Sequence, residues 1–339
     1  MNELFINILG GINSVLGNYG WSIVVFTIIV RVVLLPLDYK SRVGMRKTAL
    51  IQPKIQALQK KYAKDQEKLN QKMAELYKKE KVNPMSSCLP LLLSYPILIM
   101  MFNAMRAVAN QSIVEQVLEI LQNPGQMPAL ESWLWIKNVW QPDSPFASAL
   151  PDLNMLRQVT ADVWTKSFAA NPEQWAAVLA NYPQLAELSL ETFTNSLQNN
   201  VQTLYTALAS TEVYTAASGS IPGWTFNLLI AQLSIMKEWN GLFILPAFSA
   251  CSQLLMTKLN PVQPAANNDQ NAQQQSTMSF MNWFFPLFTL WICSSSNGMF
   301  ALYWVTGNII MMVETWGINK YLDMKDKTAK PVEGEGAIK

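Results

Sequence analysis

The chain has 339 residues, of which 50% are apolar and only 14% are charged, with a formal net charge of +2. A soluble globular domain usually carries about 25% charged residues, so this composition argues against a single soluble core and favours a chain that lies in lipid. The sequence contains no histidine, which removes the usual general base and the commonest metal ligand and excludes most histidine-dependent enzymes.

Residues 1–19 are predicted to form an amphipathic helix at a membrane interface. Leu4, Ile8 and Leu9 lie on one apolar stripe together with similar residues further along the segment. A cleaved signal peptide fits less well, because Glu3 is the only charged side chain before Arg31 and the basic n-region is missing.

Five apolar stretches have a length near that needed to cross a bilayer. They are residues 20–39, 86–108, 241–259, 278–294 and 298–320. The fourth is short, so it requires a thinned bilayer or a protein-lined end. The second contains Pro90 and Pro96, which neighbouring helices tolerate in a membrane. The sequence therefore predicts an all-α integral membrane protein with five transmembrane helices.

The segments between these stretches differ in charge. Residues 40–85 hold thirteen Lys or Arg against four acidic residues, whereas residues 109–240 hold four basic and eleven acidic residues. By the positive-inside rule, the first of these segments is cytoplasmic. The basic tail at 321–339 indicates the same orientation, with the N-terminus outside and the C-terminus in the cytoplasm.

The cytoplasmic segment 40–85 is predicted to form a hairpin of two amphipathic helices, with a break and an N-cap at Asp65. Its lysines are interpreted as a solvated face beside anionic lipid, with a nucleic-acid or ribosome patch as the alternative. Its apolar residues recur at helical spacing on each side of the break: Ile51, Ile55, Leu58 and Tyr62, then Leu69, Met73, Leu76 and Tyr77.

The large outer segment 109–240 is expected to be a small, mostly helical extracytoplasmic insert, because helical patterns at 113–121, 174–190 and 192–208 are separated by prolines. Residues 260–277 are rich in Asn and Gln and are predicted to form a flexible cytoplasmic loop.

Arg31 is the residue most in need of explanation, because a guanidinium in the middle of a membrane helix costs about 2.5–3.5 kcal/mol on insertion scales. One interpretation is snorkelling, since Asp38 lies seven residues further along, a rise of roughly 10 Å toward the cytoplasmic headgroups. The other is that Arg31 faces a water-containing cavity, where its permanent charge holds an acidic segment of another chain.

Polar residues in the other stretches favour the cavity. They lie at Ser94, Asn103, Ser252, Gln253, Thr306 and Asn308, while Thr27 lies one turn from Arg31. None of them is acidic, and Glu314 lies toward the cytoplasmic end, so a sealed Arg–acid pair or a carboxylate proton relay is poorly supported. Each residue alone is better explained as a hydrogen bond between helices than as a contact with a substrate. Together they predict a half-polar groove.

Several motifs match a known family. They are Val25–Leu37 with its arginine and terminal proline, Gln52-Pro53, Met85–Leu98 with Cys88-Leu89-Pro90, Leu245-Pro246, and Met281–Asn308 with Ala301-Leu302-Tyr303-Trp304-Val305. On these motifs the sequence resembles the YidC, Oxa and Alb insertases, and most closely the five-span members of Gram-positive-type bacteria.

The resemblance implies five helices around a hydrophilic groove that is open to the cytoplasm and to lipid. It also implies a membrane protein insertase or chaperone of the bacterial plasma membrane that acts alone or with the Sec translocon. The expected partners are nascent membrane proteins, the ribosome or signal recognition machinery, and the lipid bilayer, with no nucleic-acid substrate. The groove residues that it implies are Arg31, Thr27, Ser94, Gln253, Tyr303 and Trp304.

Three departures from the family pattern concern the groove wall and the insert. Ser94 stands where the family often has Gln, and Met256 occupies an expected polar position with Gln253 one turn earlier. Roughly a hundred residues separate Asp143 from Leu242, unlike the compact loop of five-span relatives.

Two other functions compete with the insertase. A small-solute transporter or channel requires a coupling carboxylate and usually internal repeats, and neither is visible in the sequence. A membrane hydrolase with Ser94 or Ser252 as nucleophile lacks an evident base. The cysteines Cys88, Cys251 and Cys293 lie singly, without zinc or redox spacing. We therefore expect no enzymatic activity, no metal and no cofactor.

Overall fold

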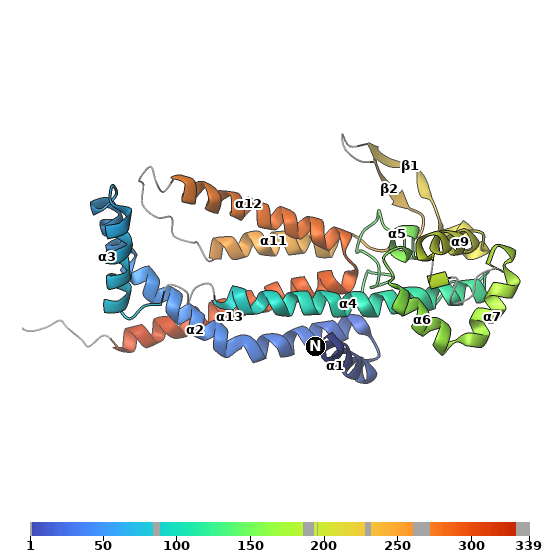
Figure 1. Ribbon diagram of the computed structural model, residues 1–339, viewed down its shortest axis with the longest axis horizontal. Coiled ribbons are helices and arrows are strands. Elements are labelled where there is room, and N and C mark those ends of the chain that lie inside the picture. Colours follow the sequence, from blue (N-terminus) through green and yellow to red (C-terminus); the bar gives the residue numbers. More distant parts are fainter. Residues whose placement is uncertain are drawn as a thin grey trace, which may run out of the picture. The chain divides into compact units, whose positions relative to one another are not determined.

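The computed structural model describes residues 2–83, 89–185, 193–194, 196–227, 232–259 and 272–329. The described part is mostly helical (Figure 1). It divides into two compact units that share several long helices. The first unit comprises Met1–Phe26, Ile99–Ala250 and Phe288–Val305, and the second comprises Thr27–Leu98, Cys251–Leu287 and Thr306–Lys339.

Long helices account for all five predicted membrane stretches, although their ends differ from the predicted ones. They are α2 (Tyr19–Lys61), α4 (Leu89–Gln122), α11 (Ile244–Leu259), α12 (Ala272–Ser295) and α13 (Gly298–Ala329). Helix α1 (Asn2–Leu16) lies within the predicted interfacial segment. The prediction of a flexible loop at 260–277 is wrong for residues 272–277, which are helical. Residues 260–271 lie outside the described part.

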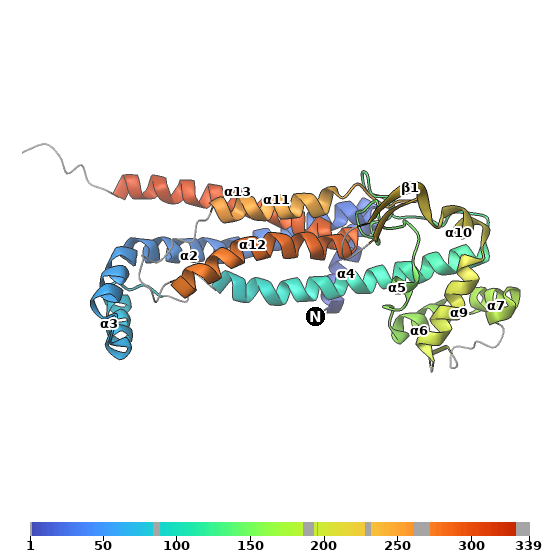
Figure 2. The same cartoon turned by 90° about the horizontal axis from the view of Figure 1, so that it is seen from above.

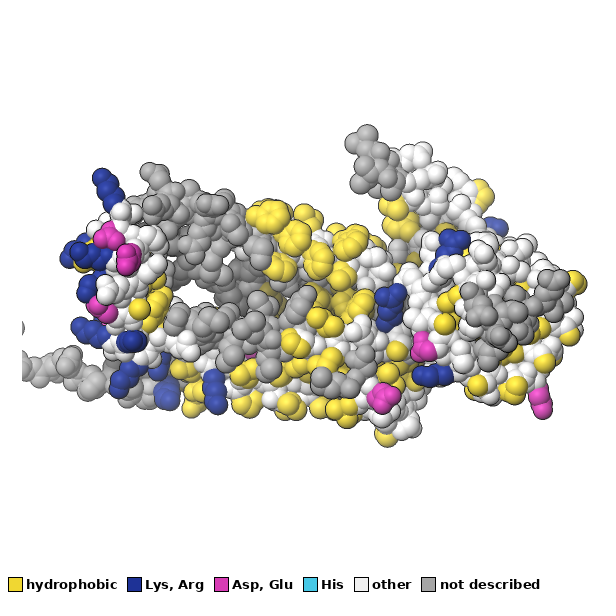
Figure 3. Space-filling view, viewed as in Figure 1, with side chains coloured by type: hydrophobic (Ala, Val, Ile, Leu, Met, Phe, Trp, Pro, Cys, Tyr) yellow, Lys and Arg dark blue, Asp and Glu magenta, His cyan; other side chains and the backbone are white. Residues whose placement is uncertain are grey.

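The apolar helices expose their apolar side chains. Within the described residues, Tyr19–Lys61 and Pro96–Gln122 are long and apolar enough to cross a membrane. Val33 is 71% exposed, Trp283 69% and Trp316 66%, and hydrophobic side chains cover much of the helical surface in Figure 3. Water disfavours such extensive apolar exposure, whereas lipid does not. The helices are those of an integral membrane protein.

Helix α2 continues from the first predicted membrane stretch into the predicted cytoplasmic hairpin. The sequence predicted that this stretch ends at residue 39, just after Pro36, but the helix runs through Pro36 and Pro53 to Lys61. A proline inside a helix removes one backbone hydrogen bond, and this loss is tolerated where surrounding groups satisfy the freed carbonyl. The hairpin therefore begins as an extension of α2 and not as a separate helix.

The second helix of the hairpin confirms the predicted N-cap. Helix α3 (Gln66–Lys79) begins after Asp65, whose Oδ1 accepts a hydrogen bond of 3.0 Å from the backbone N–H of Lys68. Lys54 Nζ lies 2.6 Å from Glu80 Oε1. Lys and Arg side chains gather over α3 and the adjoining end of α2 (Figure 3). The small core of the hairpin consists of Ile51, Ile55 and Val82, with Met73, Leu76 and Tyr77 packed against it.

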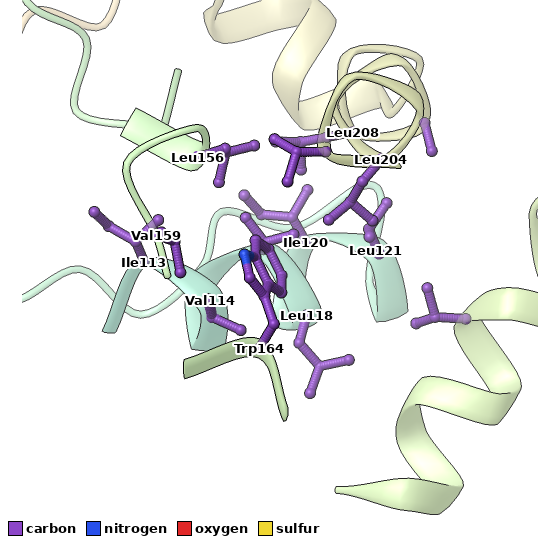
Figure 4. Packing of buried hydrophobic residues seen from close by; sticks show 14 of the residues in the cluster. Ile113, Val114, Leu118, Ile120, Leu121, Leu156, Val159, Trp164, Leu204 and Leu208 are labelled. Carbon is purple, nitrogen blue, oxygen red and sulfur yellow. The ribbon is translucent and has the colours of Figure 1, made fainter. Parts of the chain in front are cut away.

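The outer insert has a core of its own, built partly on α4. The sequence predicted that the membrane stretch ends at 108, but α4 continues to Gln122 because Val114, Val117 and Leu121 are buried in this core (Figure 4). The remaining elements of the insert are α5 (Leu153–Leu156), α6 (Ala161–Ala170), α7 (Pro172–Asn181), η2 (Pro183–Leu185), α9 (Leu197–Ala209) and α10 (Glu212–Ala217).

Aromatic side chains fill the centre of the insert core. The indole of Trp164 is fully buried, and its ring centroid lies 5.0 Å from that of Phe193. Phe168 and Trp175 stack at 4.5 Å. Such aromatic pairs add stabilisation beyond the area that they bury.

A two-stranded antiparallel sheet corrects the all-α prediction. Strand β1 (Ser220–Asn227) pairs with β2 (Gln232–Met236), with an irregularity between Ser220 and Thr225. The periodicity of the outer segment had indicated helices alone. This hairpin follows α10 and precedes α11.

Buried polar groups tie the outer insert to the start of α11. The carboxylate of Asp143 is fully buried and accepts hydrogen bonds from the backbone N–H groups of Phe243 (3.2 Å) and Leu245 (2.7 Å). A Cβ at Gly241 would lie 2.1 Å from Asp143 Oδ1, so only glycine fits there. Asn240 Nδ2 donates to the carbonyls of Asn138 and Pro142. These bonds cap the first turn of α11 with a side chain distant in sequence.

Replacing Trp164 with alanine should destabilise the insert by about 3–5 kcal/mol, the usual cost of a large cavity in an aromatic core. Pulse proteolysis in urea, with trypsin acting on the detergent-solubilised protein, measures this change. Trp291→Ala, at an indole 64% exposed on α12, is the matched control and should leave the midpoint nearly unchanged. Equal shifts for both variants would contradict the assignment of the core.

Replacing Asp143 with alanine should raise the hydrogen exchange of the Phe243 and Leu245 amides, because two donors lose their acceptor at a cost of about 1–3 kcal/mol each. Mass spectrometry of the peptide that begins α11 measures this exchange. Asp162→Ala, at an exposed position on α6, serves as the control. Unchanged exchange in Asp143→Ala would show that this carboxylate does not hold the helix start.

Candidate functional site

Arg31 lies on α2 and packs against a glycine of α13. A Cβ at Gly307 would lie 3.3 Å from Arg31 Nη2 and 3.7 Å from its Nε, so the bare backbone of Gly307 gives the guanidinium room. Arg31 is half-buried. Among the described residues, it makes no hydrogen bond or ion pair. A guanidinium has five N–H donors and can bind a carboxylate through two of them at once.

Two carboxylates accompany Arg31; the spacing along α2 had already indicated Asp38, whereas Glu314 was not expected there. Asp38 and Glu314 interact electrostatically with both Arg31 and Arg42. We call these four residues the charged cluster. One oxygen of Glu314, Oε2, is buried and lacks a hydrogen-bond partner among the described residues. The cluster pairs two positive and two negative charges, so its net charge is close to zero when both acids are ionised.

Helical spacing places Asp38 near Arg31, but it does not place Glu314 there. Asp38 follows Arg31 by seven residues on α2, and Glu314 follows Gly307 by seven residues on α13. Seven residues are almost two full turns, so each acid lies on the same face as its predecessor. Glu314 had been assigned to the cytoplasmic end, because only the packing of Gly307 against Arg31 brings this face of α13 to the arginine.

Contacts between α2 and α13 continue beyond the charged cluster. Arg42 donates a hydrogen bond to Thr315 Oγ1, and Arg46 forms ion pairs with Asp323 and Asp326. Burial lowers the pKa of the Arg42 guanidinium, and the charges of Asp38 and Glu314 oppose that shift. Arg42 remains charged at neutral pH, because the ordinary pKa of arginine is far above 7. The bonds hold the two helices in one register, which fixes the position of Gly307 opposite Arg31.

Some of the predicted groove residues bond to each other. Asn308 Nδ2 donates a hydrogen bond of 2.9 Å to Ser252 Oγ, which links α13 to α11. Thr27 is fully buried one turn before Arg31 on α2. Gln253 is half-buried on α11. The side chain of Ser94 lies outside the described residues. For Asn308 and Ser252, the interpretation as a hydrogen bond between helices is confirmed.

The two predicted aromatic site residues lie in the first unit, on turns of α13 that precede Gly307. Trp304 packs against Phe300 with ring centroids 5.7 Å apart. Its indole Nε1 is buried and has no hydrogen-bond partner in the described part of the chain. Tyr303 is half-buried beside it in sequence. A buried indole N–H without an acceptor is unusual, because such groups are normally paired.

The chemistry of these residues is that of binding. Among the described residues, no group of three Cys, Asp or Glu side chains could hold a metal ion. A permanent guanidinium beside an apolar helix surface can hold a carboxylate without proton transfer. The charged cluster and the exposed apolar side chains of α2, such as Val32 at 60% exposure, together suit an extended ligand with one acidic and one apolar part.

Comparison with known proteins places this chain in a family. The 60Kd inner membrane protein family matches residues 11–199 and 197–327. A protein named membrane protein insertase YidC from Fusobacterium nucleatum is 36% identical over 147 residues, which are 43% of this chain and 62% of that protein. Proteins of the same name from Campylobacter jejuni and Janthinobacterium are 48% and 35% identical over 93 and 137 residues.

The aligned segments are parts of longer relatives. They cover 27% of this chain and 17% of the Campylobacter protein, and 40% of this chain and 21% of the Janthinobacterium protein. The motifs around Arg31 and Trp304 lie on α2 and α13. The family match covers both helices and extends over most of the chain. The chain belongs to the 60Kd inner membrane protein family, which is the YidC/Oxa/Alb family.

Proposed function

We propose that this protein is a membrane protein insertase and chaperone of the bacterial inner membrane. The observation that carries the proposal is the guanidinium of Arg31, which lies in an apolar helix, packs on Gly307 and has no bonded partner among the described residues. The relatives named as membrane protein insertases support it. The substrates would be nascent membrane proteins with a polar tail beside an apolar segment.

In this proposal, five helices span the membrane with the N-terminus outside and the C-terminus in the cytoplasm. The charge difference between residues 40–85 and 109–240 supports this orientation. The groove residues would be Arg31, Thr27, Ser94, Gln253, Tyr303 and Trp304. The basic surface of α3 would face anionic lipid or a ribosome, and the Sec translocon and signal recognition machinery are further candidate partners.

Arg31 would lower the electrostatic cost of moving an acidic tail partway across the bilayer. When both acids are ionised, Asp38 and Glu314 balance the charge of the two arginines. A passenger carboxylate would take up the free donors of Arg31, in a charge-assisted hydrogen bond that is about twice as strong as a neutral one. The arginine would not need to titrate, because its charge is permanent.

The passenger itself would supply the driving force. Burial of its apolar segment in lipid contributes about 0.8 kcal/mol per methylene group. The membrane potential adds about 2.3 kcal/mol per 100 mV for each negative charge that moves from the cytoplasm to the outside. The exposed apolar surface of α2 would guide the apolar segment into lipid while Arg31 holds the acidic tail.

A small-solute transporter is the second candidate, and one structural observation favours it. The carboxylate of Glu314 interacts electrostatically with two arginines. Its buried Oε2 has no hydrogen-bond partner among the described residues. Coupled transporters use such groups to carry protons. Measurement of proton and solute flux in proteoliposomes separates the two candidates, because an insertase needs no continuous pathway.

Arg31→Ala should reduce the insertion of a single-span passenger with an acidic tail by about tenfold or more, as expected for the loss of a charge-assisted hydrogen bond worth about 1.5–3 kcal/mol. Arg31→Lys should retain most of the activity. Protease protection of the passenger in proteoliposomes measures insertion, and a passenger with a neutral tail is the control. Equal losses in both variants would contradict a purely electrostatic role for Arg31.

Gly307→Ala should also slow insertion of the acidic passenger, because the new Cβ approaches Arg31 Nη2 to 3.3 Å and displaces it. Gly317→Ala on the same helix is the matched control, since its Cβ meets no atom within 4 Å. Alanine at either position favours the helix by about 1 kcal/mol. Identical insertion rates for the two variants would show that contact with Gly307 does not position Arg31.

A further inference from the structure

The β1–β2 hairpin has one apolar and one polar face. Phe226 pairs with Leu233, and Thr225 pairs with Ser234, whose hydroxyl lies 3.1 Å from that of Thr225. Successive side chains in a strand point to opposite faces. The apolar face therefore carries Phe226, Leu233 and Ile235, and the polar face carries Thr225, Asn227, Gln232 and Ser234. Trp224 directly precedes this regular part of β1, at the irregularity between Ser220 and Thr225.

The apolar face of the hairpin is exposed. Trp224 is 56% exposed and Phe226 is 47% exposed. The sequence from Gly219 to Met236 contains no charged residue, and the residues that join the strands are Leu-Leu-Ile-Ala. An isolated two-stranded hairpin is marginally stable in water at best, and a soluble surface rarely displays two large aromatic side chains on an uncharged ribbon. This face therefore requires an apolar environment.

The base of the hairpin is fixed beside the start of α11. Met236 N–H donates to the carbonyl of Pro145, and Lys237 N–H donates to that of Gly219, both at 3.0 Å. Helix α11 begins at Ile244, only eight residues after the end of β2. Figure 1 shows the strands projecting from the helices of the insert near this point, and in the view of Figure 2 β1 is seen between α11 and α10.

The first turns of α11 also expose apolar side chains. Leu242 is 52% exposed, Ile244 is 40% exposed and Phe248 is 44% exposed. These residues open an apolar helix of a membrane protein, so lipid is their solvent. The hairpin and these residues belong to the same compact unit. The lipid surface that α11 enters is thus the nearest apolar medium for Trp224 and Phe226.

We propose that the β1–β2 hairpin is a membrane anchor, whose apolar face inserts into the headgroup–acyl boundary of the leaflet in which α11 begins. Trp and other aromatic side chains prefer this boundary. The lack of charge on the hairpin favours lipid over a protein partner, because protein interfaces usually have a polar rim. The anchor would hold the outer insert against the bilayer surface. It goes beyond the insertase activity and does not depend on it.

Fluorescence quenching tests the anchor directly. The three cysteines are replaced by serine, and an environment-sensitive fluorophore is attached to Phe226→Cys or, as the matched control on the opposite face, to Thr225→Cys. The full chain is placed in phosphatidylcholine nanodiscs, in which both leaflets are open to the solution. Lipids with a nitroxide close to the headgroup report insertion to a depth of about 5–10 Å, and iodide reports exposure to water.

The lipid nitroxide should quench the label at 226 several-fold more than the label at 225, and iodide should show the reverse order. Equal quenching at the two positions, or a label at 226 that iodide quenches freely, would overturn the anchor and point to a protein partner on this face. Both side chains are exposed, so neither substitution removes a buried contact. The measurement uses no passenger, so its outcome is independent of the insertase proposal.

Discussion

A guanidinium cannot lie in an apolar helix without polar neighbours, and the packing of α2 against α13 meets this constraint at Arg31. Gly307 brings the backbone of α13 close to the guanidinium. Asp38 and Glu314 supply negative charge nearby. Among the described residues, neither acid forms a hydrogen bond or an ion pair with Arg31. Direct ion pairs between Arg46 and the aspartates of α13 follow further along. These contacts hold the two helices together beyond the charged cluster.

The insert at 109–240 shares helix α4 with a predicted membrane span and is bonded to the start of α11. Helix α4 carries the residues of a predicted span and then supplies Val114, Val117 and Leu121 to the insert core. Asp143 then caps the first turn of α11. The insert therefore supports the ends of two membrane helices, through apolar packing at one and buried hydrogen bonds at the other. The insert is thus part of the same compact unit as those helix ends.

Local patterns predicted some features well. The N-cap of α3 at Asp65 was predicted from its side chain and the spacing of apolar residues around it. The pairing of β1 with β2 was not predicted, because Trp224 and Phe226 alternate with polar residues over a stretch too short to stand out within an apolar segment. The extension of α2 through Pro36 was missed since proline usually ends a helix in water, where no neighbouring helix compensates for the lost bond.

The sequence by itself determined that this is a membrane protein of the YidC/Oxa/Alb family with an arginine in an apolar helix, because composition, charge asymmetry and motif order are properties of the chain alone. Only the tertiary structure decided that Glu314 shares the surroundings of Arg31 and that Asn308 donates a hydrogen bond to Ser252. It also decided that Asp143 caps the first turn of α11. These residues lie far apart along the chain. Their contacts depend on how the helices pack, which local periodicity does not specify.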